Sequence, residues 1–389
     1  MSADLEAEPP PARCSPATGA WSDGNAIALD TTMSDVIPVR DTDQLDWARI
    51  DAYVRAGVGE VAGAPPLEAQ QFTNGAANLT YLLRFGASEL VLRRPPFGVI
   101  APGAHDMKRE WRVLSRLWRH FDRAPRAYLF CDDHAVGGAD FFVMERRHGV
   151  VIRDEIPASM AGHADAARRM GFAVVDAMAD LHLLDPEAAE VGDIGKPEGF
   201  VARQVSGWRR RWELAEPLSR ESVRAQMGAI GARLERSLPA PQRASIVHND
   251  LKLDNCAFEP ASPDRVRSIF DWDMTTLGDP LVDLGTLLNY WPDPADPPET
   301  RRASHEGMRR MGLPSRAEIT ARYVARTGLD PAPVRWYEAF AQWKTAVVVQ
   351  QLHNRWRQGA SADRRHERIA DTVPALAATA VRLLDEAGL

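Results

Sequence analysis

Residues 248–255 read HNDLKLDN and residues 271–273 read DWD, and the fold that we expect follows mainly from these two segments. Between them lie two short apolar runs, Cys256 to Phe258 and Val266 to Phe270, with a turn rich in Pro, Ser and Asp in the middle. Apolar runs on either side of such a turn predict a β-hairpin. The hairpin would return the DWD stretch to the side of the first loop, so that polar groups far apart in the sequence come together.

The polar groups that would meet there fit the transfer of a phosphoryl group. This reaction needs a carboxylate that orients or deprotonates an incoming hydroxyl, and oxygen ligands that hold Mg²⁺ against a triphosphate. Asp250 is the candidate base, while Asn255 and Asp271 are candidate ligands of the ion, which keeps few protein ligands. Lys252 is one of only four lysines in the chain, and it is placed to neutralise the transferred phosphate.

A simpler interpretation of the loop competes with this one. A loop rich in Asp and Asn can serve only to turn the chain and cap a helix. We favour the chemical interpretation because the loop, its spacing and the strand that ends at Asp271 agree with one another. His248 is a separate case, since such a histidine is more often a hydrogen-bonded core residue than a proton carrier, and we expect the core role.

The composition is that of an ordinary globular protein. The chain has 389 residues, of which 45% are hydrophobic and 26% charged, and its formal net charge is −7. An acidic chain has no overall charge attraction to nucleic acid or to an anionic membrane, so we expect neither partner. The three cysteines are scattered and show no metal-binding spacing. The first residues do not resemble a secretory signal and no apolar run could span a bilayer, so we expect a cytoplasmic protein.

Strand patterns precede the loop and helical patterns surround it. A helix is predicted from His105 to Phe121, and the clearest of the later helices runs from Met170 to Leu184. Four short runs predict two antiparallel strand pairs, Leu79 to Phe85 with Glu89 to Arg93, and Tyr128 to Cys131 with Asp140 to Glu145.

These patterns indicate an α+β protein of two lobes. Residues 1–42 lack periodicity and predict a disordered tail. Residues 43–147 predict an N-terminal lobe made of an antiparallel sheet and a helix, and residues 148–389 a mostly helical C-terminal lobe that carries the 248–255 loop.

The loop and the acid that follows the strand resemble the aminoglycoside phosphotransferase family of the protein-kinase-like superfamily, whose loop has the form HxDxxxxN and whose next strand ends in DxD or DxE. The resemblance implies a bilobal protein-kinase-like fold with ATP bound between the lobes. Carried over by position, it implies that Asp250 is the catalytic base and that Asn255 and Asp271 are the Mg²⁺ ligands. It also implies that the helical lobe binds a small molecule whose hydroxyl accepts the phosphate.

Two further positions follow from this resemblance. Asp273 stands where close relatives often carry Glu, and is one methylene shorter. Residues 278–285 read GDPLVDLG and resemble the family's GDPxxDL segment, which implies that Asp283 braces the catalytic loop and does not react. His248 is implied to fix the loop.

The N-terminal lobe supports the same interpretation. Alternation along Leu90 to Arg93 puts Val91 and Arg93 on one face of the strand. The resemblance implies that Val91 lies under adenine, that Arg93 meets the α- and β-phosphates where Lys is usual, and that Glu110 is its ion-pair partner. The alternative is a surface arginine in an arginine-rich chain.

Two other segments resemble nucleotide-binding parts of the family. Residues 72–80 could cover the phosphates, but they hold a single glycine, and an ordinary hairpin turn is nearly as good an interpretation. The strand that ends at the lobe boundary is implied to meet adenine with its main chain, which places Met144, Glu145 and Arg147 there.

The match extends beyond the catalytic loop to one branch of the family, the kinase-like domain that occurs fused to acyl-CoA dehydrogenases and its free-standing bacterial relatives. The segments that carry this resemblance include NLTYLLR at 78–84, LRRPP at 92–96, AHDMKRE at 104–110 and YEAF at 337–340. The resemblance implies a hydroxyacyl-CoA thioester as acceptor. WRRRW at 208–212 could hold its nucleotide-like tail, or could be a solvated helix face with two tryptophans turned inward.

Three functions therefore compete. The first is an ATP- and Mg²⁺-dependent kinase of a small-molecule hydroxyl, with a hydroxyacyl-CoA preferred. The second is an aminoglycoside or related antibiotic kinase. The third is a catalytically silent nucleotide-binding module that regulates a partner; the presence of Asp250, Asn255 and Asp271 argues against it, and Arg93 in place of Lys keeps it open.

Overall fold

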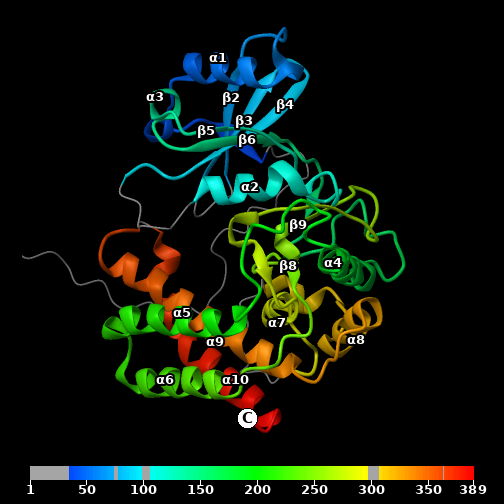
Figure 1. Ribbon diagram of the computed structural model, residues 1–389, viewed down its shortest axis with the longest axis vertical. Coiled ribbons are helices and arrows are strands. Elements are labelled where there is room, and N and C mark those ends of the chain that lie inside the picture. Colours follow the sequence, from blue (N-terminus) through cyan, green and yellow to red (C-terminus); the bar gives the residue numbers. More distant parts are fainter. Residues whose placement is uncertain (1–34, 74–77, 99–105, 297–305, 362) are drawn as a thin grey trace, which may run out of the picture. The chain divides into compact units, whose positions relative to one another are not determined.

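An antiparallel sheet of six strands forms the first part of the protein (Figure 1). The computed structural model describes residues 35–389 except 74–77, 99–105, 297–305 and 362. Both predicted strand pairs are present, and β4 joins them by pairing with β6. In spatial order the strands are β1 (Val36–Pro38), β2 (Glu68–Phe72), β3 (Leu79–Phe85), β4 (Ser88–Arg94), β6 (Phe141–Glu145) and β5 (Ala127–Cys131).

Two helices cover the opposite faces of this sheet (Figure 1). Leu90 and Leu92 of β4 pack in the core that contains the buried residues of α1 (Trp47–Gly57). Val91 belongs to the other core, together with the apolar residues of α2 (Met107–Leu117). The alternation predicted for β4 is therefore confirmed, and it directs Arg93 to the α2 side of the sheet.

Three details of the sheet differ from the prediction. The segment 1–42 was expected to be a tail, but β1 lies within it and pairs with β2; residues 1–34 lie outside the described residues. The sequence of neither strand shows the alternation of apolar and polar residues that predicts a strand. β1 has only three residues, and β2 reads EAQQF, which is mostly polar. Between the two strands of the second predicted pair, the chain forms the short helix α3 (His134–Gly137), which Gly138 ends with a φ of 75°.

The rest of the protein is mostly helical, with two small antiparallel pairings that hold the 248–255 loop. The pair β8 (Ser245–Val247) and β11 (Thr276–Gly278) lies beside a three-stranded sheet of β7 (Val150–Val151), β9 (Cys256–Phe258) and β10 (Val266–Ile269). Residue 147, the lobe boundary expected from the sequence, falls between β6 and β7. The long helices are α4 (Ala166–Leu183), α5 (Phe200–Ala215), α6 (Glu221–Arg236), α7 (Leu281–Tyr290), α8 (Arg316–Thr327), α9 (Val334–Arg357) and α10 (Val373–Glu386).

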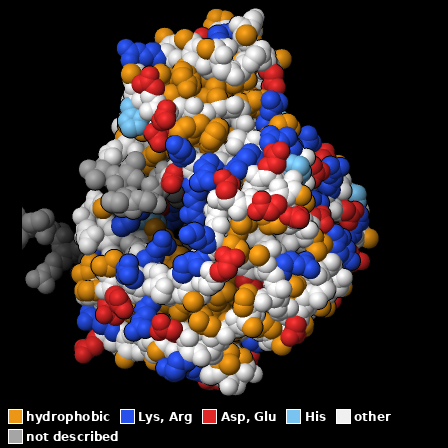
Figure 2. All heavy atoms as spheres, viewed as in Figure 1, with side chains coloured by type: hydrophobic (Ala, Val, Ile, Leu, Met, Phe, Trp, Pro, Cys, Tyr) orange, Lys and Arg blue, Asp and Glu red, His pale blue; other side chains and the backbone are white. Residues whose placement is uncertain are grey.

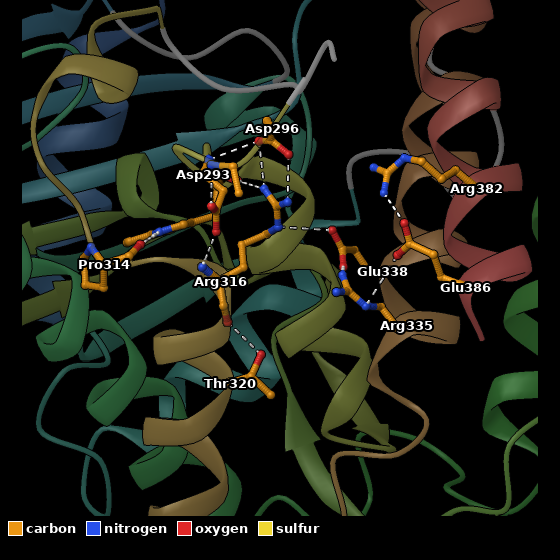
Figure 3. Close-up of polar contacts among 11 residues, drawn as sticks. Asp293, Asp296, Pro314, Arg316, Thr320, Arg335, Glu338, Arg382 and Glu386 are labelled. Atoms are coloured by element: carbon orange, nitrogen blue, oxygen red, sulfur yellow. Dashed lines mark hydrogen bonds and ion pairs between the residues drawn. The ribbon is translucent and has the colours of Figure 1, made fainter. Parts of the chain in front are cut away.

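A buried ionic network fastens α8 to α9 (Figure 3). Arg316, at the start of α8, binds both carboxylate oxygens of Asp296 at 2.7 and 2.8 Å. Glu338 of α9 lies 3.5 Å from the same guanidinium and 3.1 Å from Arg335. A buried charge is costly unless it is paired with an opposite charge. This network therefore holds α8 and α9 together. Among the described residues, no helix is both long and apolar enough to cross a membrane.

Candidate active site

The 248–255 loop runs from β8 to β9, and the predicted hairpin of β9 and β10 returns the chain to it. The main-chain N–H of Phe270 donates to the carbonyl of Asn255 at 2.8 Å, which places Asp271 beside the loop. Asn249 and Asp271 have φ values of 65° and 68°. Non-glycine residues adopt this left-handed conformation rarely, and such strain is often found at functional sites.

Asp250 is held by two side chains of its own loop. Lys252 Nζ donates to Asp250 Oδ2 at 2.9 Å. Asn255 Nδ2 donates to the main-chain oxygen of Asp250 at 2.8 Å and to Oδ2 at 3.2 Å. Burial disfavours the charged form of Lys252, but Asp250, Tyr290 and Asp254 together outweigh burial and raise the pKa of Lys252, so the side chain is a cation. Three of the predicted site residues are therefore in direct contact.

Asp283 braces the start of the loop, as the family resemblance implied. Its carboxylate accepts hydrogen bonds from the main-chain N–H groups of His248 at 2.7 Å and Asn249 at 2.6 Å. His182 Nε2 lies 3.0 Å from the same carboxylate. All four residues are buried, so one buried carboxylate holds the main-chain N–H groups at the strained start of the loop.

His248 is a core residue, as expected. Burial lowers its pKa, which favours the neutral ring. Its Nε2 lies 2.9 Å from the carbonyl of Phe270, and its Nδ1 accepts a hydrogen bond from the N–H of Asp250 at 3.3 Å. Both ring nitrogens are thus occupied in fixing the loop against β10.

Arg93 connects the sheet to the loop region. Its guanidinium donates to Glu110 Oε1 at 3.0 Å and to Asp271 Oδ1 at 2.6 Å. The predicted ion pair with Glu110 is present, and with 12% of its side chain exposed, Arg93 is not a surface arginine. Burial raises the pKa of Glu110 to about 7, although Arg93 opposes the rise. The two terminal nitrogens of the Arg93 guanidinium each bind one of the acids, an arrangement that a lysine, with its single ammonium, would lack.

The carboxylates near Arg93 repel one another. Burial raises the pKa of Asp273 to about 6, and the neighbouring charge of Asp271 adds to the effect. Burial also acts on Asp271, but Arg93 outweighs it and keeps the pKa of Asp271 below its ordinary value. Added positive charge would relieve this repulsion.

Met144, Glu145 and Arg147, the residues implied to lie near the adenine, are at or just after the end of β6. They make none of the contacts of the 248–255 loop described above. Met144 pairs with Val91 in register and is nearly buried. Glu145 accepts from the N–H of Arg126, and Arg147 donates to the carbonyl of Ala124 at 3.0 Å. The side chains of Glu145 and Arg147 therefore fix the end of the strand through contacts with the segment before β5. Of the predicted phosphate-covering segment 72–80, residues 74–77 lie outside the described residues.

A cavity of about 170 Å³ opens beside Asn249. Its walls come from α2, α5 and the segment after Asp273. The described residues that line it are Arg109, Arg203, Gln204, Gly207, Trp208, Arg211, Asn249 and Met274. None of these is acidic. The predicted 208–212 cluster is divided by the helix, because Trp208 and Trp212 are buried, whereas Arg209 turns to the surface and pairs with Glu235.

Lys344 is a site residue that sequence reasoning missed. It lies on α9, 95 residues from Asn249, and its Nζ donates to the carbonyl of Asn249 at 2.9 Å. Its ammonium is also 5.5 Å from the ring centre of Trp208. The scarcity of lysine in the chain was the only signal that could have found it.

Comparison with known proteins gives one family. The sequence pattern of the phosphotransferase enzyme family matches residues 68–337. Acyl-CoA dehydrogenase family member 11 of Mus musculus is 31% identical over 359 residues, which cover 90% of this chain and 44% of that protein. Family member 10 of the same organism is 29% identical over 321 residues, 82% of this chain and 29% of that protein. The chain thus spans less than half the length of these relatives.

Solved structures show the same fold. A protein from Ralstonia eutropha, provisionally described as an aminoglycoside phosphotransferase, has a TM-score of 0.70 and 27% identity, covering 88% of this chain and 99% of that one. Choline kinase from Cryptosporidium parvum has a TM-score of 0.63 with 12% identity, covering 88% and 97%. The α+β bilobal protein-kinase-like fold predicted from the sequence is therefore confirmed.

Proposed function

Because this chain belongs to the phosphotransferase enzyme family, we propose that it transfers the γ-phosphate of ATP to a hydroxyl of a small molecule, with a hydroxyacyl-CoA thioester as the preferred acceptor. The convergence of Asp250, Asn255 and Asp271 carries the proposal, since these groups come from two segments that the β9–β10 hairpin brings together. The bond from the γ-phosphorus to the bridging oxygen breaks, a bond to the acceptor oxygen forms, and ADP leaves.

The donor set fits a magnesium ion bound with a nucleotide. Asn255 uses its amide nitrogen on Asp250, which leaves its carbonyl oxygen to bind an ion, and Asp271 has a second carboxylate oxygen beside the one bound to Arg93. Among the described residues, no three His, Cys, Asp or Glu side chains form a metal cage. Mg²⁺ suits such a site because it keeps phosphate oxygens and waters as ligands. When bound, the ion would neutralise charge on the phosphates.

Each contacting residue has a role in this proposal. Asp250 accepts the proton of the acceptor hydroxyl, and Lys252 holds that carboxylate in place and offsets negative charge on the moving phosphate. Arg93 turns from Asp271 toward the α- and β-phosphates, with Glu110 keeping it in position. Met144, Glu145 and Arg147 mark the strand end whose main chain meets the adenine.

The preference for a CoA thioester rests on the relatives and on the cavity. Curated relatives of this chain are named as acyl-CoA dehydrogenase family members, which supports acyl-CoA chemistry. The cavity beside Asn249 has arginines in its wall and no acidic residue among the described lining. Polycations such as aminoglycosides would be repelled there, whereas the phosphates of CoA would be attracted.

An acceptor screen tests the proposal. With ATP and Mg²⁺, the protein is expected to convert a 4-hydroxyacyl-CoA to a phosphorylated thioester with release of ADP, and chelation of Mg²⁺ is expected to stop the reaction. The product would be measured by mass spectrometry, with kanamycin tested in parallel. Turnover of kanamycin alone would overturn the acceptor, and ATP binding without turnover of any acceptor would favour a silent regulatory module.

Replacement of Arg93 tests its role at the nucleotide. Arg93→Met is expected to weaken MgATP binding about 10- to 100-fold, because a charged hydrogen bond contributes about 1.5–3 kcal/mol. Arg93→Lys should retain most of the affinity, since an ammonium still reaches a phosphate. Calorimetric titration with MgATP would measure both, and thermal unfolding would show whether Glu110, left unpaired by methionine, destabilises the fold. Arg84→Met is the matched control, because Arg84 lies on neighbouring β3 and pairs with Glu89. Equal affinity of wild type and Arg93→Met would remove the assignment.

A further inference from the structure

The cations around the cavity beside Asn249 differ from those arginines of the helical part that are paired with acids. Arg209 pairs with Glu213 and Glu235, and Arg322 pairs with Asp176. On the face drawn in Figure 2, Lys and Arg side chains also gather along the hollow below the sheet. The cavity cations have no carboxylate within ion-pairing distance among the described residues.

Arg211 is the clearest of them. Its guanidinium lies over the ring of Trp208, 4.3 Å from the ring centre, in a cation–π contact. Partial burial lowers the pKa of Arg211, and no neighbouring acid counters that effect. An arginine stacked on an aromatic ring keeps its N–H donors free in the plane of the guanidinium, available to an anion.

The other cations contact carbonyl oxygens. Arg203, two turns before Arg211 on α5, donates to the carbonyls of Lys196 and Glu198. Arg109, on α2, donates to the carbonyl of Met274 at 3.2 Å. Lys344 donates to Asn249 and lies over the ring of Trp208. Carbonyl contacts orient a cation without neutralising its charge, so positive charge gathers around Trp208. Lys344 differs from the arginines in that burial lowers its pKa, whereas the charges of Asp250 and Asp283 act in the opposite direction.

Resting on the phosphotransfer function proposed above, we propose that Arg203, Arg211 and Lys344 form, around Trp208, a binding subsite for phosphate groups that the acceptor itself carries. The acceptor class is then a phosphate-bearing alcohol, and in a CoA thioester the subsite takes the nucleotide phosphates. Lys344 ties the subsite to the loop, because the same ammonium holds the carbonyl of the residue before Asp250. Anchoring the remote phosphates would direct the acyl hydroxyl toward that carboxylate.

Arg211→Gln tests the subsite, with Arg209→Gln as the matched control on the same helix. Arg211 has no acidic partner among the described residues, so its loss leaves no buried carboxylate unpaired. Arg211→Gln is expected to raise the KM for 4-hydroxybutyryl-CoA about tenfold, with kcat within about twofold. The KM for the pantetheine thioester of the same acid, which has no phosphate, should stay unchanged. Arg209→Gln should alter neither.

Calorimetry with CoA alone separates this inference from the proposed function. Wild type is expected to bind CoA, Arg211→Gln to bind it about tenfold more weakly, and added salt to weaken binding to the wild type more than to the variant. Equal binding by wild type and Arg211→Gln, or an equal loss in Arg209→Gln, would overturn the subsite. If CoA binds as expected and no thioester is phosphorylated, the subsite stands and the proposed reaction fails.

Discussion

Asp250→Asn is expected to lower kcat about 10³-fold while the affinity for MgATP stays within about threefold, because positioned general bases contribute about 10²–10⁴-fold. An asparagine can accept a hydrogen bond from the acceptor hydroxyl but cannot take its proton. The variant should fold normally, since Asn255 and Lys252 contact Asp250 at a partly exposed site where an amide fits. Any loss therefore reports on the chemical step.

The measurement is single-turnover phosphorylation of the acceptor identified by the screen, with MgATP titrated separately. Asp264→Asn is the matched control, because Asp264 lies in the turn between β9 and β10 and pairs with Arg169 at the surface. This control should retain wild-type kcat. If Asp250→Asn kept more than about a tenth of wild-type kcat, Asp250 would not be the general base.

The parts of the site that the sequence predicted are those joined by short-range structure. The β9–β10 hairpin is local, so the spacing between the loop and Asp271 was enough to bring them together. The family resemblance implied the pair of Arg93 and Glu110, and alternation along β4 placed Arg93 on the same face as Val91. Asp283 was found through a motif just beyond the hairpin, and its hydrogen bonds to the loop confirm that bracing role.

The parts that the sequence did not predict depend on long-range packing. Lys344 reaches Asn249 only because α9 packs beside α5 and α7, and helical periodicity marks most of α9 as buried without showing which neighbour each residue meets. The pairing of β1 with β2 was missed for a similar reason, since a strand of three residues has no pattern of its own. The burial of Trp208 and Trp212 agrees with the second interpretation of residues 208–212, a helix face with its tryptophans turned inward, but the sequence did not show which residues they would meet.

Asp283→Ala is expected to lower the free energy of unfolding by about 3–5 kcal/mol, the usual cost of removing one partner from a buried charged network. The change leaves three buried donors without an acceptor, the N–H groups of His248 and Asn249 and the ring of His182. The strained conformation at Asn249 would then relax, and Asp250 would move with it. We therefore expect kcat to fall in the folded variant as well, at low temperature where it remains native.

Urea unfolding at several pH values separates this role from a general packing effect. Burial disfavours ionised Asp283, but His182 and the loop outweigh it and hold the pKa of Asp283 below its ordinary value. The carboxylate therefore stabilises the fold fully above its unfolded pKa, about 3.9, and this contribution is lost as the pH falls through the lower folded value. The difference between wild type and Asp283→Ala should accordingly be largest near neutral pH and shrink in acid. Asp283→Asn keeps the shape but meets the two N–H donors with one acceptor oxygen, so its loss should be intermediate. A difference independent of pH would mean that the side chain acts by packing alone.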